Sequence, residues 1–436
     1  MTESVLFVAP SAYPLGGVAT WLDYLLPGLA ERGWRAVLGL TAGRFHDVDH
    51  YRARHPWSDV VPIESPTGTP EGRVRALVRT MRQLRPDLVA GVNIPDAYAA
   101  VARMRAGGEP APRVLMTNHS VEEQYLRDAE SWAATLDGLV CTNRLACRQA
   151  LQHRRLDAGR IHYAGYGVAF PADVPSRRPG SSILRIAYSG RLDGPQKRVN
   201  DIPAILASLD RDGVAYELLI AGAGPQEEEL KARLRPQLET GRVQFLGVLD
   251  AAALVPEVYR RADVLLVTSL WETGPIVTWE AMAQGLAVVT SRYVGSASEG
   301  SLKDGVNCLM YEIGDAQAAA AQLQRVRDLG ESLAAAGRQL VEERYTHAVS
   351  VATWDACLRR ILLSPGLPEP AASRPMAAAA GRLDALVGTG GAETVRQVLR
   401  RRYRHVEPGG EWPHSHSESA TDQATYWDAA RRLDHG

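Results

Sequence analysis

Residues 264–285 read VLLVTSLWETGPIVTWEAMAQG, an apolar run that leads into a polar loop and then into a helical pattern. The run Val264–Thr268 predicts a buried strand, and Ile276–Gln284 predicts a helix. Pro275 suits the first helical position, where its missing N–H would be unpaired anyway, and Gly285 suits the C-terminal cap. The stretch therefore indicates a parallel α/β sheet in which a helix starts just beyond the carboxyl end of a strand.

The same alternation of strands and helices extends on both sides of this stretch. In the second half of the chain, the expected elements are Leu184–Ser189, Val199–Leu209, Tyr216–Ala221, Glu227–Leu238, Val243–Leu246, Ala251–Arg261 and Leu286–Thr290. In the first half, they are Val5–Ala9, Val18–Arg32, Ala36–Leu40, Arg73–Leu84, Leu88–Val92, Val114–Thr117 and Gly138–Thr142. Strands that alternate with helices predict doubly wound α/β sheets.

The chain of 436 residues is too long for one ordinary core, and the proline-rich stretch Pro171–Gly180 divides it. We expect two facing Rossmann-like domains, residues 1–170 and 171–345, with ligands bound in a cleft at the carboxyl ends of the strands. A helix over 346–365 is expected to return to the first domain. Residues 366–436 are expected to hold a linker, a basic helix over Ala392–Arg404 and, from Glu407, a polar tail that is disordered or only loosely docked.

The composition is that of an ordinary globular protein. Apolar and charged residues make up 45% and 23% of the chain. The formal net charge of −1 argues against a protein that mainly coats nucleic acid, although local basic patches remain compatible with it. The four cysteines have neither zinc-finger nor disulfide-framework spacing. The N-terminus lacks a signal-peptide pattern, and no run of about eighteen apolar residues predicts a membrane span. We therefore expect a cytoplasmic protein.

Two segments carry charged residues suited to binding a phosphorylated ligand. Glu272 precedes the predicted helix and Glu280 lies on it, and the free amides at the start of this helix attract phosphate. The two carboxylates can accept hydrogen bonds from vicinal hydroxyls. Arg191 and Lys197, in the loop SGRLDGPQKR, follow a strand and can neutralise a diphosphate. The alternative interpretation is a solvated helix with two surface glutamates and an ordinary charged loop.

Two glycine loops follow further strands. Gly16 and Gly17 open the first helix, where backbone amides can approach a phosphate closely. Gly222 and Gly224, in the segment LIAGAGP, could border a nucleotide, although a structural turn explains them as well.

Together these segments resemble the retaining glycosyltransferases of the GT-B fold, specifically the large family-4-like group. The resemblance extends from about Val5 to Leu363 and is stronger in the second half. The residues that carry it are Gly16-Gly17, Gly190-Arg191, Lys197, Ala221–Pro225, Phe245–Gly247 and the span from Glu272 to Gly285, which is similar to the E-x7-E signature of that group.

The resemblance implies a donor site for a nucleotide diphosphate sugar. The catalytic residues would be Arg191, Lys197, Glu272 and His119, the last in the segment Thr117–Ser120 after a predicted strand. The donor-binding residues would be Gly16, Gly17, Gly190, Gly222, Gly224, Gly274, Pro275, Ile276 and Glu280. Arg191 and Lys197 would hold the diphosphate, Glu280 the ribose and Glu272 the sugar, with no cofactor and no divalent metal.

The chain departs from the family pattern at three places. Pro275 stands where many members have glycine, and Trp279 precedes the second glutamate of the signature. Gly295–Gly300 reads GSASEG, where many members carry a Gly-Gly-x-x-Glu loop. The tail after Pro365 has no counterpart in the family pattern.

Two further features have competing interpretations. Asp47-Val48-Asp49, between His46 and His50, resembles a D-x-D metal motif, but we interpret it as a plain surface loop. Arginines gather on one predicted helix, which would allow peripheral contact with an anionic membrane or simply form a solvated face. These arginines are Arg73, Arg75, Arg79, Arg82 and Arg85.

The sequence predicts sugar transfer to a hydroxyl acceptor, which would be a saccharide, a lipid-linked molecule or a small molecule, and it predicts no nucleic-acid partner. A nucleotide-sugar epimerase or hydrolase on the same fold is the first alternative. The second is a non-catalytic relative that only binds nucleotide sugars. The sequence names neither the base nor the sugar.

Overall fold

The computed structural model describes residues 2–11, 17–41, 47–55, 59–92, 94–174, 183–367, 381–401 and 419–435. Its internal contacts divide the chain into two compact units. Unit 1 comprises Met1–Ala164 and Val351–Tyr426, and unit 2 comprises Gly165–Ser350 and Trp427–Gly436. The units divide at 164/165 and 350/351, whereas the expected domain limits are at 170/171 and 345/346.

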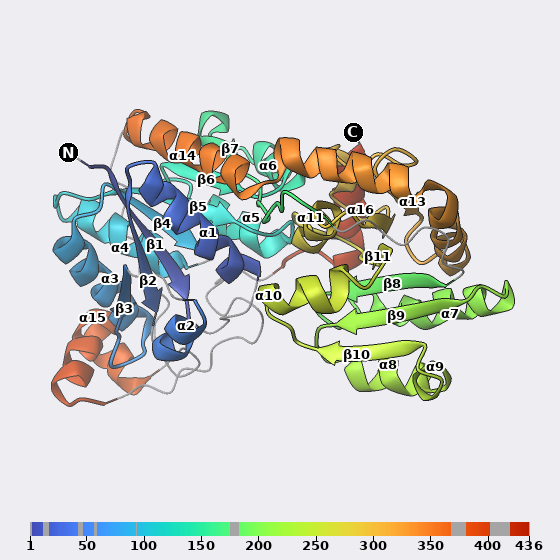
Figure 1. The fold of residues 1–436 in the computed structure, drawn as a ribbon. Coiled ribbons are helices and arrows are strands. Elements are labelled where there is room, and N and C mark those ends of the chain that lie inside the picture. Colours follow the sequence, from blue (N-terminus) through green and yellow to red (C-terminus); the bar gives the residue numbers. More distant parts are fainter. Residues whose placement is uncertain are drawn as a thin grey trace. The chain divides into compact units, whose positions relative to one another are not determined.

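Unit 1 contains a parallel sheet in the order β3-β2-β1-β4-β5-β6-β7 (Figure 1). Its strands are β1 Ser4–Pro10, β2 Arg35–Thr41, β3 Val60–Ile63, β4 Leu88–Val92, β5 Arg113–Asn118, β6 Gly138–Cys141 and β7 Ile161–Tyr163. Its helices are α1 Gly17–Glu31, α2 Val48–Arg54, α3 Pro70–Leu84, α4 Pro95–Ala106, α5 Glu123–Ser131, α6 Arg144–Leu151, the 3-10 turn η1 Ala158–Arg160 and α15 Arg382–Val398. The strand order reverses between β1 and β4, as in a doubly wound fold.

Unit 2 contains a second parallel sheet, in the order β10-β9-β8-β11-β12-β13. Its strands are β8 Leu184–Ser189, β9 Tyr216–Ala221, β10 Val243–Gly247, β11 Val264–Val267, β12 Ala287–Ser291 and β13 Leu309–Tyr311. Its helical segments are η2 Val199–Asp201, α7 Ile202–Arg211, α8 Glu227–Arg233, α9 Arg235–Glu239, α10 Ala251–Leu254, η3 Val255–Tyr259, α11 Ile276–Ala283, α12 Ser296–Glu299 and α13 Ala316–Arg344. Two more helices, α14 His347–Leu363 and α16 Gln423–His435, contain residues of both units.

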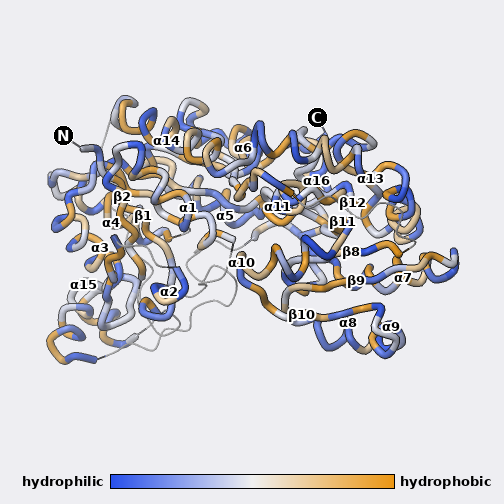
Figure 2. The backbone as a smooth tube through the Cα atoms, viewed as in Figure 1, coloured by the Kyte–Doolittle hydropathy of each residue, from blue (hydrophilic) through white to orange (hydrophobic). Residues whose placement is uncertain are grey.

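Successive residues of the unit 2 strands belong to two different apolar cores, one on each face of the sheet. Ile186 of β8 packs in a core with Leu206 of α7 and Leu323 of α13. Its neighbour Ala187 belongs to another core, which contains Trp279 of α11. Because successive side chains of a strand point to opposite faces, helices cover both faces of this sheet. Figure 2 shows the result, with apolar colour concentrated on strands such as β1 and β9.

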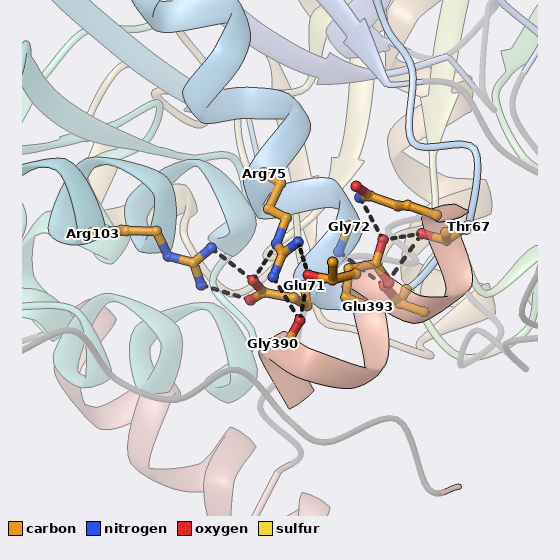
Figure 3. Close-up of polar contacts among 10 residues, drawn as sticks. Thr67, Glu71, Gly72, Arg75, Arg103, Gly390 and Glu393 are labelled. Atoms are coloured by element: carbon orange, nitrogen blue, oxygen red, sulfur yellow. Dashed lines mark hydrogen bonds and ion pairs between the residues drawn. The ribbon is translucent and has the colours of Figure 1, made fainter. Parts of the chain in front are cut away.

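In unit 1, a buried carboxylate holds helix α15 against the start of α3 (Figure 3). Glu393 of α15 is fully buried and accepts hydrogen bonds from the hydroxyls of Thr67 at 2.6 Å and Thr69 at 2.5 Å. Arg75 of α3 donates to the carbonyl of Gly390 at 2.7 Å. Since a buried carboxylate is stable only when it is hydrogen-bonded, these contacts make α15 an integral part of unit 1.

Two of the arginines of α3, Arg73 and Arg82, form ion pairs within unit 1. Arg73 is buried and pairs with Asp96 at 2.5 Å, and Arg82 pairs with Glu109 at 2.7 Å. Arg85 ends the helix in the left-handed conformation, with φ 48°. These contacts favour a structural role for the cluster, and the membrane contact stays a prediction. None of the helices in the described ranges combines the length and apolar content that crossing a membrane requires.

Most expected strands are confirmed within two residues, and Leu184–Ser189, Tyr216–Ala221 and Leu88–Val92 match to the residue. The short strands β3, β7 and β13 were not expected. The three residues of β7 and of β13 are too few to show a pattern, and β3 contains Pro62, which disfavours a strand. The segment expected as one helix over Ala251–Arg261 instead changes from α10 into the π-helical turn η3.

The structure also differs from the expectation near the C-terminus. The basic helix expected over Ala392–Arg404 ends at Val398, and helix α15 starts earlier, at Arg382. The tail expected to be disordered or loosely docked contains α16, which buries Trp427, Ala430 and Asp434. Burial of these side chains gives the helix a stability that its polar composition does not indicate.

Candidate functional site

In unit 2, the candidate site lies at the carboxyl ends of β8 and β11. These strands are neighbours in the sheet, and the strand order reverses between them. Loops that leave such a point diverge and leave room for a ligand. The loop after β8 contains Arg191 and Lys197, and the loop after β11 contains Glu272. The sheet order therefore brings together three predicted residues that lie up to 81 positions apart (272 − 191).

Lys197 and Glu272 form the central contact of the site. The Nζ atom of Lys197 lies 2.7 Å from Oε1 of Glu272, and Glu272 is only 5% exposed. The hydroxyl of Ser269 donates to the same carboxylate oxygen. Two backbone contacts fix this arrangement: Leu270 N donates to the carbonyl of Gln196 at 2.7 Å, and the Thr268 hydroxyl donates to the carbonyl of Lys197 at 2.5 Å. The two loops thus form one hydrogen-bonded unit.

Arg191 is held by a carboxylate that the sequence interpretation missed. Its Nε lies 2.5 Å from Oδ2 of Asp193, and its Nη2 donates to Oε1 of Gln196 at 2.7 Å. Burial of Asp193 opposes ionisation, but hydrogen bonds from Arg191 and from the amides of Lys197 and Gln196 outweigh it and lower the pKa of Asp193. Asp193 lies in the loop SGRLDGPQKR between Arg191 and Lys197, and its position between two cations is a signal in the sequence that it pairs with one of them.

The predicted glycines bring two loops into close backbone contact. A Cβ on Gly222 would lie 1.9 Å from the carbonyl oxygen of Gly190, and one on Gly224 would lie 2.4 Å from that of Leu192. Gly190 and Gly222 also have positive φ values of 149° and 136°, which L residues rarely adopt. In the structure, these glycines pack the loop after β9 against the loop after β8. This supports the structural-turn alternative for Gly222 and Gly224, and their contact with a donor stays a prediction.

Helix α11 starts and ends much as its sequence indicates. Gly274 has φ 101°, and Pro275 is the N-cap with ψ 86°, so the helix starts at Ile276 rather than at the proline. At the other end, Gly285 has φ 72° and donates its N–H to Met282. This is a glycine-capped helix end, as expected.

Glu280 is held by a tyrosine that carries no recognisable sequence signal. The hydroxyl of Tyr259 donates to Oε2 of Glu280 at 2.7 Å. Burial raises the pKa of Glu280 to about 7, and the hydrogen bond from Tyr259 partly offsets this rise. Tyr259 ends the π-helical turn η3, and such turns are frequent at functional sites. Stacking of Trp279 on Tyr345, with ring centroids 4.1 Å apart, fixes the same part of α11.

In unit 1, two of the predicted residues are described. Gly17 is exposed and starts α1, whereas Gly16 lies outside the described residues. His119 follows β5 and is 6% exposed, with Nε2 2.8 Å from the Thr117 hydroxyl and its ring 4.8 Å from that of Trp21 in α1. Burial lowers the pKa of His119 to about 3, so the ring is neutral at physiological pH.

The D-x-D segment has a structural role in unit 1. Asp47 is the N-cap of α2 and its carboxylate accepts the amide hydrogen of His50 at 2.8 Å. The segment is therefore the start of a helix rather than a plain loop. His46 lies outside the described residues.

Two family models match this chain, one on each half. Residues 15–169 match the model described as Glycosyltransferase Family 4, and residues 184–328 match the model described as Glycosyl transferases group 1. The second range includes Arg191, Lys197, Glu272 and Glu280, and neither range includes α16.

Characterised relatives match part of the chain. A glycogen synthase of Mycobacterium tuberculosis is 32% identical over 166 residues, which cover 38% of each chain. A phosphatidyl-myo-inositol mannosyltransferase of Mycolicibacterium smegmatis is 34% identical over 193 residues, or 43% of this chain and 47% of the relative. The matched regions thus span less than half the length of these relatives.

Solved structures share the fold over most of the chain. Anabaena Alr3699/HepE, in complex with UDP and glucose, has a TM-score of 0.65 at 18% identity and covers 81% of this chain and 99% of its own. A glycosyltransferase from Rickettsia africae has a TM-score of 0.67 at 14% identity and covers 84% and 100%. The expectation of a GT-B fold with two Rossmann-like domains is therefore confirmed. Models of the family-4-like, group 1 glycosyltransferases match both halves of the chain, and the chain therefore belongs to this family.

Proposed function

We propose that this protein transfers a sugar from a nucleotide diphosphate sugar to a hydroxyl acceptor, with retention of the anomeric configuration. The observation that carries the proposal is the contact between Lys197 and Glu272 at the carboxyl ends of β8 and β11. It joins a cation suited to a phosphate with a carboxylate suited to sugar hydroxyls, in a loop that leads directly into α11.

Each part of the site would hold one part of the donor. Glu280 would accept hydrogen bonds from the ribose hydroxyls, and Arg191 and Lys197 would contact the diphosphate. Glu272 and the amides from Gly274 to Ile276 would orient the sugar. Since Lys197 is already paired with Glu272 at 2.7 Å, the diphosphate would share this lysine with the carboxylate rather than meet an unpaired cation.

The chemistry requires one bond to break and one to form at the anomeric carbon. The bond from that carbon to the diphosphate oxygen breaks, and the nucleoside diphosphate leaves with both electrons. The acceptor oxygen bonds to the same face of the sugar, and its proton passes to the leaving phosphate. Arg191 and Lys197 would stabilise the negative charge that develops on this phosphate. Glu272 would orient the donor and is not assigned as a nucleophile.

The test is an assay of the purified protein with a panel of nucleotide sugars, with and without saccharide and lipid-linked acceptors. Transfer should yield a nucleoside diphosphate and a glycoside whose anomeric configuration, read by NMR, equals that of the donor. Lys197→Gln should lower kcat about 100-fold or more, on the scale known for loss of one charge-stabilising donor. Lys231→Gln is the matched control, because Lys231 is a solvent-accessible lysine of α8 in the same unit.

Different outcomes would favour the two alternatives. A free sugar or an epimerised nucleotide sugar, formed at a rate that acceptors do not change, would identify a hydrolase or an epimerase. Thermal stabilisation by a nucleotide sugar without any product would identify a binding protein. Absence of both binding and turnover across the panel would contradict the proposal.

The names of two relatives suggest the class of acceptor. The matched mannosyltransferase acts on a phosphatidyl-myo-inositol, as its name states, and the glycogen synthase is named for a polysaccharide. We propose a saccharide or a lipid-linked acceptor on this basis. A vesicle-binding assay with anionic lipids would test the peripheral membrane contact that goes with the lipid-linked alternative.

A further inference from the structure

The last helix of the chain packs against the loop that carries Glu272. Trp427 of α16 stacks on Trp271, with ring centroids 4.3 Å apart and an angle of 24° between the planes. Both indoles are at least nine-tenths buried. Trp271 directly precedes Glu272 in the chain, so this stacked pair fixes the backbone from which the Glu272 side chain extends.

The same helix inserts a carboxylate into the neighbouring loop. Asp434 is 3% exposed, and its Oδ1 accepts the amide hydrogen of Ser298 at 2.6 Å. Its Oδ2 accepts those of Gly295 at 2.8 Å and Ala297 at 3.4 Å. A buried carboxylate that accepts several amide hydrogens is strongly held in one orientation. Asp434 therefore fixes the loop GSASEG, which is one of the places where this chain departs from the family pattern.

That loop is bonded directly to the Glu272 backbone. Glu272 N donates to the carbonyl of Val294 at 3.3 Å, and Val294 N donates to the carbonyl of Leu270 at 2.9 Å. A Cβ on Gly295 would lie 2.9 Å from the carbonyl oxygen of Glu272, so the two backbones are in close contact. A displacement of the loop at Gly295 would therefore be transmitted to Glu272.

We infer that α16 is a positioning element for the donor sugar, acting through Trp427 and Asp434 on Glu272. This inference rests on the proposed function, in which Glu272 orients the sugar. The groups that would hold the nucleotide part have partners outside α16: Glu280 contacts Tyr259, and Arg191 contacts Asp193 and Gln196. The helix would thus chiefly set the affinity for the sugar and the rate of transfer. Its effect on the affinity for the nucleoside diphosphate would be smaller and would pass only through Lys197, which is paired with Glu272.

The test uses full-length Asp434→Asn and Trp427→Ala variants. In Asp434→Asn, an amide group faces backbone N–H donors, and we expect kcat/KM for the donor to fall about tenfold or more. The dissociation constant of the nucleoside diphosphate alone should stay within about twofold. A variant that is merely less stable would weaken both ligands together. Trp427→Phe should restore most of the loss, because it keeps an aromatic ring against Trp271.

Controls separate this inference from the proposed function. Asp428→Asn changes an exposed aspartate of the same helix, which pairs only loosely with Arg431 at 3.3 Å, and should behave like the wild type. Combining Asp434→Asn with Glu272→Gln should cost little more than Glu272→Gln alone, since both act on one contact. Wild-type kinetics of Asp434→Asn, or additive losses in the double variant, would overturn the inference. A wild-type protein without nucleotide-sugar turnover would instead refute the proposed function.

Discussion

Replacing Tyr259 by phenylalanine should shift the pH dependence of the reaction to higher pH. The Tyr259 hydroxyl donates to Glu280 at 2.7 Å, and burial raises the pKa of this carboxyl to about 7. The hydrogen bond favours the ionised form, so its loss raises the pKa of Glu280 further. In the proposed donor site, only the carboxylate of Glu280 could accept two hydrogen bonds from the ribose without competition from its own proton. The variant should therefore bind the donor poorly near neutral pH.

The size of the effect follows from the strength of one hydrogen bond to a charged group. Such a bond contributes about 1.5–3 kcal/mol, and 1.36 kcal/mol corresponds to one pH unit, so the profile should move by about 1–2 pH units. At pH 7 the ionised fraction of Glu280 would fall from about one half to about 1–10%. The value of kcat/KM for the donor would then drop about 5- to 50-fold at pH 7 and largely recover at pH 9.

The assay is kcat/KM for the nucleotide sugar between pH 5.5 and 9.5, because this constant reports ionisation in the free enzyme. Tyr216→Phe is the control, since Tyr216 lies in the same sheet but contacts Asp210, at 3.3 Å. Superimposable profiles for Tyr259→Phe and wild type would refute the role of Tyr259. A wild-type profile that is flat between pH 6 and 8 would refute the requirement for an ionised Glu280.

Three further predictions concern unit 2 and His119. Gly222→Ala should lower the free energy of unfolding by at least about 2 kcal/mol, because its Cβ would lie 1.9 Å from a carbonyl oxygen. The control Gly213→Ala, at a position with φ 67° and open space around the added Cβ, should lower it by about 1 kcal/mol. Equal losses for the two variants in denaturant titrations would contradict this. Glu280→Gln should raise the melting temperature relative to wild type more at pH 8 than at pH 5. The reason is that a carboxyl with a raised pKa stabilises the fold below pH 4.5 and loses this contribution as the pH rises through 7; a difference independent of pH would speak against it. The imidazole resonances of His119 should not titrate between pH 5 and 8, because burial lowers the pKa to about 3, and an NMR midpoint near 6.5 would disprove the buried neutral ring.

The sheets and the cationic loop were predictable because local patterns encode them. The unit 2 strands are predominantly apolar, as strands covered on both faces require; β11 is wholly apolar, and β8 and β9 each contain one charged residue, next to the first position of the strand. Arg191, Lys197 and Glu272 were identifiable because they follow such runs, and the sheet order then placed them together. The pairing of Lys197 with Glu272 was not predicted, since it depends on which strands become neighbours.

Other parts of the site carry no local signal. Tyr259 reaches Glu280 because α10 changes into a π-helical turn. Pro256 disfavours an uninterrupted α-helix over Ala251–Arg261, but the sequence does not show which kind of turn replaces it. Helix α16 is polar overall and follows a long polar segment, so composition indicated a disordered tail. Its structure depends on two buried side chains, Trp427 and Asp434, whose partners lie well over a hundred residues away.

The pairing of charges in unit 2 has a consequence for turnover. Arg191 faces Asp193 and Lys197 faces Glu272, so two formal positive charges are matched by two negative ones and this part of the site is close to electroneutral before the donor arrives. A diphosphate would enter a balanced set of dipoles and ion pairs rather than an excess of positive charge, and long-range attraction would contribute little to its capture. The departing nucleoside diphosphate, which carries more charge than the donor, would likewise meet competing carboxylates. Under the proposed function, such a site would favour release of the nucleoside diphosphate over its retention.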